Sequence, residues 1–455
     1  MASGSDFRRL WAANAASEAG GAIGFGALPL VAILALEVPA WQVSLLATVS
    51  GLAAAAIALP VGPWIEFHHK RPVMVTADLV RAVALLTVPV ALAFDLLTFA
   101  QLGVVAVVQA AGAIAFTAAG GAHLKALVTA PDRAAAAGRL EATSWTVGTV
   151  GPPLGGALTS GIGVGWTITV DALSFVLSAG AVRSLRGREP QPPPRVATSS
   201  RRAEITMGWR YILAHPGLRA LFLNSQIFGA ALLAASPLLA VLMLRELRFP
   251  AWQYGLAWGL PCLGGVLGAL ALKPLARRFG EHRVLLASGA GRTVGLCLLA
   301  ATPAGPAGLM LVIVVQTVAL FGSGVFNPAF ATYRMTETED PFLSRVISCW
   351  SITSRISQPV GIALGGVLAA TTDIRTAVLI CGVVVVASTA MLPWRSAVEP
   401  LPPGRTYAEQ VERGCRTRGR GSAWSPWAEI GCEIASSGRA AAGGRGGRRR
   451  RGDRL

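Results

Sequence analysis

Two carboxylates stand deep inside long apolar segments, where a charge is costly. Glu18 lies in the segment 10–36 and Asp171 in the segment 165–182. A charged side chain at the centre of a membrane span costs about 2.5–3.5 kcal/mol on insertion scales, so its presence indicates a function. A carboxylate in an apolar medium can take up and release a proton. Glu18 and Asp171 are therefore the candidate proton-coupling residues, and the alternative for each is a hydrogen-bonding or packing group.

Other charged side chains are expected to hold helices together or to control access. Asp78 and Arg81 are three positions apart, so they share one helix face and can pair. Glu141 stands where an apolar segment begins and is expected to pair with a loop cation. Arg292 and Arg355 each require a carboxylate, a carbonyl or an anionic substrate, and packing onto a partner helix is the expected role for both.

The segments that carry these residues indicate an integral membrane protein. The chain is 53% hydrophobic and only 14% charged, against roughly 25% charged residues in soluble proteins. A helix needs about 20 apolar residues to cross a bilayer. Twelve such segments occur, near 10–36, 41–64, 72–94, 99–121, 143–162, 165–182, 218–243, 252–272, 284–303, 307–330, 347–370 and 375–394. The predicted fold is all-α, with twelve transmembrane helices.

Lysine and arginine divide the loops into two classes. They gather in alternate loops and in the central connection, which by the positive-inside rule predicts that both termini are cytoplasmic. Pro190 and Pro192–Pro194 exclude regular structure from the central connection. We therefore expect four regions. They are an N-terminal six-helix half (1–186), a cytoplasmic linker with an interfacial helix (187–216), a C-terminal six-helix half (217–396) and a disordered basic tail (397–455).

The two halves repeat at a constant offset. Val107-Val108-Gln109 corresponds to Val314-Val315-Gln316 at 207 positions, and the same offset relates Pro152 to Pro359. Each match is weak in apolar sequence, but the shared offset indicates two pseudo-symmetric halves, as in transporters built from parallel repeats.

Several stretches are also similar to a known family. They include Phe7-Arg8-Arg9-Leu10-Trp11, Ala77-Asp78-Leu79-Val80-Arg81 and Asp171-Ala172-Leu173-Ser174-Phe175. Over residues 7 to 396 the chain resembles major facilitator superfamily transporters, in particular the actinobacterial efflux branch related to the enterobactin exporter and to macrolide efflux permeases. This resemblance implies a multi-pass protein of the cytoplasmic membrane that acts as a monomer.

Two family motifs are present with departures. In the loop after the second helix, Glu66, Lys70 and Arg71 fit the pattern, but Phe67 replaces a basic residue and His69 replaces a glycine. In helix 5 the family's antiporter motif matches Gly151, Pro152, Gly155 and Gly156. Small residues allow helices to approach closely, so a packing role is the alternative. The helix 4 arginine of proton antiporters is absent, with Ala106 near its place.

The resemblance implies that the first and fourth helices of each half line a central path. Their polar residues are the candidate substrate contacts: Asn14, Ser17, Gln109, Asn224, Gln226 and Gln316. A few polar groups in an apolar cavity suit an amphipathic substrate.

No cofactor, metal site or enzymatic activity is implied. The three lysines follow no glycine-rich phosphate loop, and no catalytic motif occurs. We expect a secondary active transporter that exports small amphipathic molecules, such as drugs, natural products or siderophores, with protons as the coupling ion. The alternatives are a facilitator or importer of a small solute and, from another class, a membrane scaffold or sensor that acts through the basic tail. Nucleic acid is not an expected partner.

Overall fold

A computed structural model describes residues 4–24, 26–128, 133–185 and 201–394, and the regular structure of these residues is helical. The N-terminal half begins with α1 (Gly4–Ile23), which α2 (Ala27–Leu30) and the π-helical turn η1 (Val31–Ala35) extend. It continues with α3 (Ala40–Glu66), α4 (Lys70–Ala93), α5 (Phe99–Leu127), α6 (Arg133–Ile162) and α7 (Val164–Arg183).

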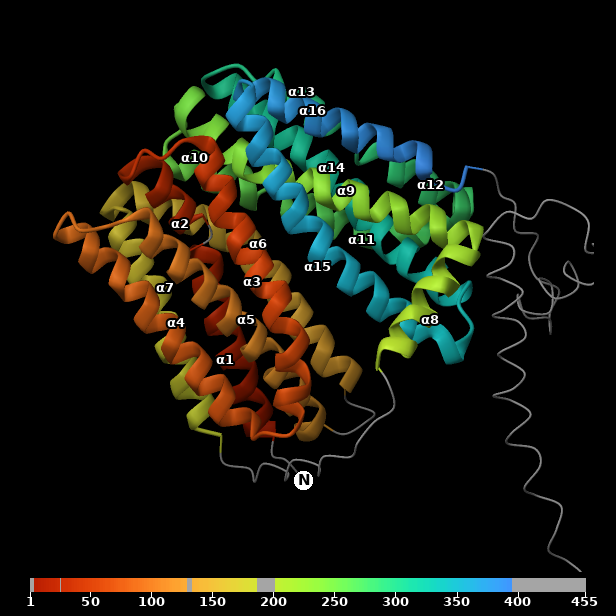
Figure 1. Ribbon diagram of the computed structural model, residues 1–455, viewed down its shortest axis with the longest axis horizontal. Coiled ribbons are helices and arrows are strands. Elements are labelled where there is room, and N and C mark those ends of the chain that lie inside the picture. Colours follow the sequence, from red (N-terminus) through yellow and green to blue (C-terminus); the bar gives the residue numbers. More distant parts are fainter. Residues whose placement is uncertain (1–3, 25, 129–132, 186–200, 395–455) are drawn as a thin grey trace, which may run out of the picture.

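The C-terminal half follows α8 (Arg201–Ala214). Its elements are α9 (Pro216–Val241), η3 (Leu242–Glu246), α10 (Ala251–Gly259), α11 (Cys262–Phe279), α12 (Glu281–Gly291), α13 (Gly295–Ala300), α14 (Pro306–Thr336), α15 (Asp340–Thr371), α16 (Ile374–Ala387) and η4 (Ser388–Met391). In Figure 1 the red-to-yellow helices of the first half and the green-to-blue helices of the second form two bundles side by side.

Ten stretches of the described residues are long and apolar enough to cross a membrane. The two further long helices, α6 and α15, have 30 and 32 residues but include more polar positions. With these two, each half has six helices of membrane length. The prediction of an all-α membrane fold with twelve helices in two halves is confirmed.

The two halves meet through glycines on helices that cross. A Cβ on Gly156 of α6 would lie 2.4 Å from the carbonyl oxygen of Ala251, where α10 begins. A Cβ on Gly255 of α10 would lie 2.2 Å from the carbonyl oxygen of Pro152. The helices α3 and α15 approach in the same way, with Gly51 against Pro359. These crossings close the contact between the halves on the membrane side where Gly163 joins α6 to α7, which we call the Gly163 side.

The same helices are exposed toward their other ends, on the side where α8 packs against α9 and α15, which we call the α8 side. Glu141 and Ser144 of α6 are exposed, as are Ser351 and Arg355 of α15. Since α6 and α15 are tightly packed between the halves on the Gly163 side, this change in burial indicates that the halves separate toward the α8 side.

One turn recurs in both halves on the Gly163 side. Pro39-Ala40-Trp41-Gln42 is repeated as Pro250-Ala251-Trp252-Gln253. Each copy follows a five-residue π-helical turn, η1 or η3, and a residue with positive φ, Glu37 (50°) or Arg248 (54°). This repeat has an offset of 211 positions. The offset between α6 and α15, the fifth transmembrane helices of the two halves, is 207, as Pro152 and Pro359 show. An insertion in the chain between this repeat and the fifth helices explains the two offsets.

Candidate functional site

Glu18 lies on α1 in a small polar group at the border between helices. The amide nitrogen Nδ2 of Asn14 donates to its Oε1 at 2.8 Å, and the hydroxyl of Ser144 on α6 donates to its Oε2 at 2.7 Å. Glu18 is half-buried and Ser144 is exposed. Trp145, the residue after Ser144, packs beside Gly265 of the other half. The Glu18 group therefore lies next to the space between the halves.

The partners of Glu18 determine its chemistry. Both hydrogen bonds come from neutral donors, and no cation within the described residues forms an ion pair with it. A hydroxyl can turn to accept rather than donate, and the amide can be flipped. The group can therefore hold either the carboxylate or the carboxylic acid without rearrangement of the backbone, and it can also accept a hydrogen bond from a substrate.

A second cluster surrounds Arg81 in the interior of the N-terminal half. Its Nη1 lies 3.5 Å from Oδ1 of Asp78 and 3.3 Å from the hydroxyl of Ser17. Gln109 binds it twice, accepting from Nε at 3.1 Å and donating to the Arg81 carbonyl at 2.8 Å. The Phe175 ring lies 3.8 Å from the guanidinium carbon. Arg81 thus joins α1, α4, α5 and α7.

Asp171 lies close to this cluster but is not hydrogen-bonded to Arg81. It is buried on α7, near enough to Arg81 for the two charges to interact. It packs against α1, where a Cβ on Gly24 would lie 2.1 Å from its Oδ2. Its Oδ1 is buried and has no hydrogen-bond partner among the described residues. The cluster therefore combines two carboxylates with a single guanidinium.

The C-terminal half places Arg292 at the position of Arg81, and among the described residues no carboxylate forms an ion pair with it. Arg292 follows Arg81 at the offset of 211. Its Nη2 donates to Oδ1 of Asn224 at 3.1 Å, and its guanidinium lies between the rings of Phe228 and Phe326, at 3.8 and 3.7 Å. The structure thus places Arg292 against an amide and two aromatic faces, which are partners that stabilise a cation.

Most of the expected substrate contacts of the C-terminal half form hydrogen bonds with other side chains or with the backbone. Asn224 is fully buried and donates to the Ser388 carbonyl at 2.8 Å. Gln226 donates to Ser354 at 3.1 Å and accepts from Ser357 at 2.9 Å. The amide nitrogen of Gln316 is buried with no partner among the described residues. Ser17 and Gln109, in the other half, hold Arg81. Of the six candidates, Asn14 shares Glu18 as an acceptor with the exposed Ser144 of α6.

The motif predicted for the fifth transmembrane helix lies in α6, and its glycines pack against two different helices. A Cβ on Gly151 would meet Ala22, and one on Gly155 would lie 2.0 Å from the Ile23 carbonyl oxygen, both in the first helix of the same half. Gly156 instead packs against α10 of the other half, where Pro152 also lies. The motif therefore both packs α6 within its half and forms part of the contact that closes between the halves.

Three of the remaining charged residues have partners close by. Lys70 donates to the His68 carbonyl at 2.7 Å, and Arg71 donates to the Leu185 carbonyl at 3.0 Å; the side chain of Glu66 lies outside the described residues. Glu141 accepts from the indole of Trp145 at 3.0 Å, and the side chains of the loop cations Lys125 and Arg133 lie outside the described residues. Arg355 is exposed and has no ion-pair partner within the described ranges.

Sequence reasoning missed three features of these sites. Ser144 completes the Glu18 group from another helix, and no spacing rule connects positions 126 residues apart. The aromatic partners Phe175, Phe228 and Phe326 are ordinary core residues in the sequence. The repeated Pro-Ala-Trp-Gln was visible, and it would have shown the offset of 211 directly.

Comparisons with known proteins agree with this architecture. The sequence model of the Major Facilitator Superfamily matches residues 10–270 and 227–435. The enterobactin exporter EntS of Escherichia coli O1:K1 is 27% identical over 231 residues, which are 50% of this chain and 53% of that protein. The chain thus matches about half the length of these curated relatives.

Solved structures of transporters have the same fold. A point mutant of the nucleoside transporter NupG aligns with a TM-score of 0.66 at 15% identity, over 85% of this chain and 99% of that one. A bacterial homologue of the iron transporter ferroportin in its inward-facing state gives 0.66 at 17% identity, over 85% and 98% of the two chains. The outward-facing state of that homologue gives 0.56 at 16% identity, over the same shares. The family model spans both halves, and with the twelve-helix architecture it shows that this chain belongs to the major facilitator superfamily.

Proposed function

We propose that this protein is a secondary active exporter of small amphipathic molecules, driven by protons and working by alternating access. Transport by a member of the superfamily is the starting point, and export is suggested by the match to the enterobactin exporter. The observation on which the proposal rests is the Glu18 group, a carboxylate with only neutral hydrogen-bond donors beside the space between the halves.

The coupling step follows from this environment. With the path open on the α8 side, which we propose is cytoplasmic, the carboxylate releases its proton to the cytoplasm and the substrate enters beside Asn14 and Ser144. After the halves have rocked, the acidic outer medium protonates Glu18, and the substrate leaves. Neutral donors suit both states because they impose no fixed charge.

Asp171 is the second candidate for the coupling proton. It has an unpartnered oxygen and a neighbouring arginine, but it is more deeply buried than Glu18 and packs against Gly20 and Gly24. Its proton would have to pass between α1 and α7, so we propose that it stabilises the Arg81 cluster and that Glu18 exchanges with the solvent.

The substrate class follows from the surroundings of the path. Most of the six polar side chains expected there are hydrogen-bonded to other protein groups, which leaves a surface on which few of their donors and acceptors are free for a substrate. Such a surface binds lipophilic molecules with one or two polar groups better than it binds sugars. A facilitator or importer remains the second hypothesis, and the two differ in whether the substrate can be moved against its own gradient.

Growth assays test the proposal and identify a substrate. A pump-deficient bacterial host that expresses the wild-type chain is grown on a panel of toxic amphipathic compounds, beside hosts that express Glu18→Gln and Glu141→Gln at matched membrane levels. We expect wild type and Glu141→Gln to confer resistance to the same compounds and Glu18→Gln to confer none. Full resistance with Glu18→Gln would refute the role of Glu18.

A further inference from the structure

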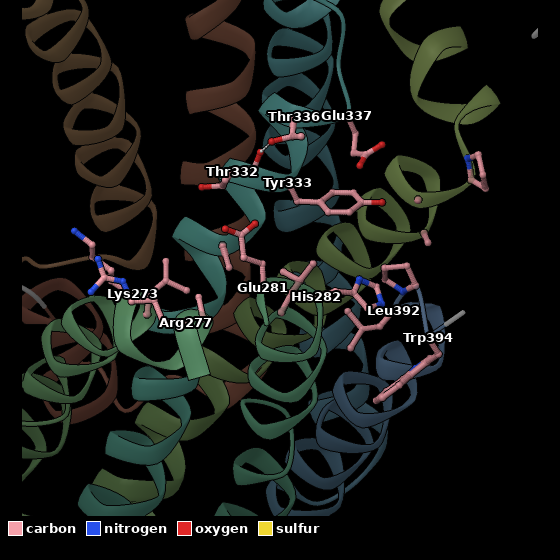
Figure 2. Close-up of a pocket in the computed structure, with 18 of the residues that line it drawn as sticks. Lys273, Arg277, Glu281, His282, Thr332, Tyr333, Thr336, Glu337, Leu392 and Trp394 are labelled. Carbon is pink, nitrogen blue, oxygen red and sulfur yellow. Dashed lines mark hydrogen bonds between the residues drawn. The ribbon is translucent and has the colours of Figure 1, made fainter. Parts of the chain in front are cut away.

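A large cavity lies in the C-terminal half, apart from the path beside Glu18. Its volume is about 1290 Å³, and it opens among α9, α11, α12, α14 and the chain after η4. Residues at its wall include Lys273, Arg277, His282, Tyr333 and Trp394 (Figure 2). Its lining belongs entirely to the C-terminal half, so it is not the space between the halves.

Two unpaired cations stand together at one side of this cavity. Lys273 and Arg277 are four positions apart on α11 and therefore on one face. Figure 2 shows both at the same edge of the cavity, with Glu281 closer to its middle. Both are exposed, and within the described residues neither forms a hydrogen bond or an ion pair. Glu337, on the far side, lies 3.3 Å from Nε2 of His215. The carboxylates of Glu281 and Glu337 also line the cavity, so the two cations mark one side of it and the lining as a whole has no excess of positive charge.

Part of the wall is apolar, and the cavity lies where two of the membrane spans end. Leu272, Leu285 and Leu392 line it, with Trp394 at the rim. The span Ala251–Phe279 ends beside Lys273 and Arg277, and the span Ile374–Met391 ends just before Trp394. A tryptophan at such a position is typical of the boundary between hydrocarbon and head groups. The cavity therefore combines cations with an apolar wall at the depth of a lipid head group.

The equivalent place in the N-terminal half contains a hydrogen bond between two segments. There Arg71, at the start of α4, donates to the Leu185 carbonyl beyond α7 at 3.0 Å. His282 follows Arg71 at the offset of 211, and Leu392 follows Leu185 at 207. Both His282 and Leu392 line the cavity, and Nε2 of His282 is buried without a partner among the described residues. Where Arg71 and Leu185 are in contact in the N-terminal half, the corresponding His282 and Leu392 line a cavity in the C-terminal half.

We propose that this cavity binds one anionic glycerophospholipid, with its phosphate between Lys273 and Arg277 and its first methylene groups against Leu272 and Leu285. Phosphatidylglycerol is such a lipid, and its single negatively charged phosphate would lie at the side of the cavity where Lys273 and Arg277 are close together. The cavity exceeds the roughly 300–1,000 Å³ of ordinary small-molecule pockets, so a head group and the start of two acyl chains fit. Basic pockets between helices at this membrane surface are known lipid sites in general.

Lipid retention tests this site without any transport assay. The full chain is reconstituted in phosphatidylcholine nanodiscs with a minor share of phosphatidylglycerol, and native mass spectrometry counts the lipids that stay bound. We expect the double variant Lys273→Ala/Arg277→Ala to lose one phosphatidylglycerol, with affinity roughly 30-fold lower because each cation near an anionic lipid contributes about fivefold. The control Arg278→Ala/Arg283→Ala removes two exposed arginines, one at the end of α11 and one at the start of α12, that do not line the cavity, and it should keep the lipid.

A second variant separates shape from charge. Ala276→Trp keeps both cations and fills the cavity beside them, so it should also lose the lipid, while its melting temperature shows whether the chain is folded. Retention of the lipid by both cavity variants, or equal loss in the control, would overturn the proposal. Displacement by inorganic phosphate at millimolar concentration would show a free-anion site instead. A lipid gained on deletion of residues 395–455 would show that the tail occupies the cavity, which also contradicts the proposal.

Discussion

The crossing of α6 and α10 makes a quantitative prediction for the conformational equilibrium. Any side chain at Gly156 places its Cβ 2.4 Å from the Ala251 carbonyl oxygen and 3.0 Å from the Trp252 Cα, and both of these are backbone atoms that cannot turn aside. Overpacking of this kind costs about 1–3 kcal/mol. The cost applies only while the halves are in contact on the Gly163 side. Gly156→Val should therefore shift the equilibrium about 5- to 150-fold toward the state that is open on that side.

Distances between the halves measure this shift. Spin labels at Leu96 and Met310, which are exposed on the Gly163 side of the two halves, report their separation by double electron–electron resonance after the native cysteines are replaced. Gly148→Val is the matched control, since it adds the same side chain to the same helix where nothing lies within 4 Å. A longer distance for Gly156→Val than for Gly148→Val is expected. Identical distributions in two folded variants would refute the reasoning.

Two further predictions concern stability. Arg81→Met leaves Asp78 and Asp171 buried without their cation, a loss of about 3–5 kcal/mol, whereas Arg292→Met leaves only the Asn224 amide without its partner, at about 1–3 kcal/mol. Thermal unfolding in detergent should therefore show the larger decrease for Arg81→Met, and equal decreases would contradict the assigned partners. Asp373 accepts from the backbone N–H of Thr376 at 2.9 Å, and its hydrogen bonds to Thr376 lower its pKa. The carboxylate therefore stabilises the start of α16 above the ordinary aspartate pKa, and this stabilisation is lost as the pH falls through the lowered value. Hydrogen exchange in the first turn of α16 should rise on acidification in the wild type, and a wild-type pH response in Asp373→Ala would exclude this cap.

The sequence was sufficient for the fold because each helix has its own apolar signal. A span is local, and about 20 apolar residues identify it whatever it packs against. The pairing of Asp78 with Arg81 was visible for the same reason, since both residues are on one turn of one helix. The repeat was detected through Gln109 and Gln316, although its offset differs among the helices and the clearest copy begins at Pro39 and Pro250.

The sites required the tertiary structure. Glu18 and Ser144 are joined only because α6 packs across α1, and Gly151 and Gly155 permit that approach. Arg292 needed no carboxylate because two aromatic rings enclose it, and sequence spacing does not reveal such a sandwich. The polar residues of the lining helices were expected to face the path, but Asn224 and Gln226 face neighbouring helices, since a polar side chain on a transmembrane helix can bridge helices as well as line a cavity.

Transport in everted membrane vesicles tests proton-driven export through Glu18 most directly. The compound to which the expressing host gains most resistance is added to the medium outside the vesicles, and the interior of the vesicles is made acidic. Wild type should accumulate the compound against its gradient and release it when a protonophore is added. Glu18→Gln, folded and at equal levels, should equilibrate the compound without accumulating it. Accumulation by Glu18→Gln at the wild-type level, or accumulation in the wild type that ignores the proton gradient, would contradict the proposed mechanism.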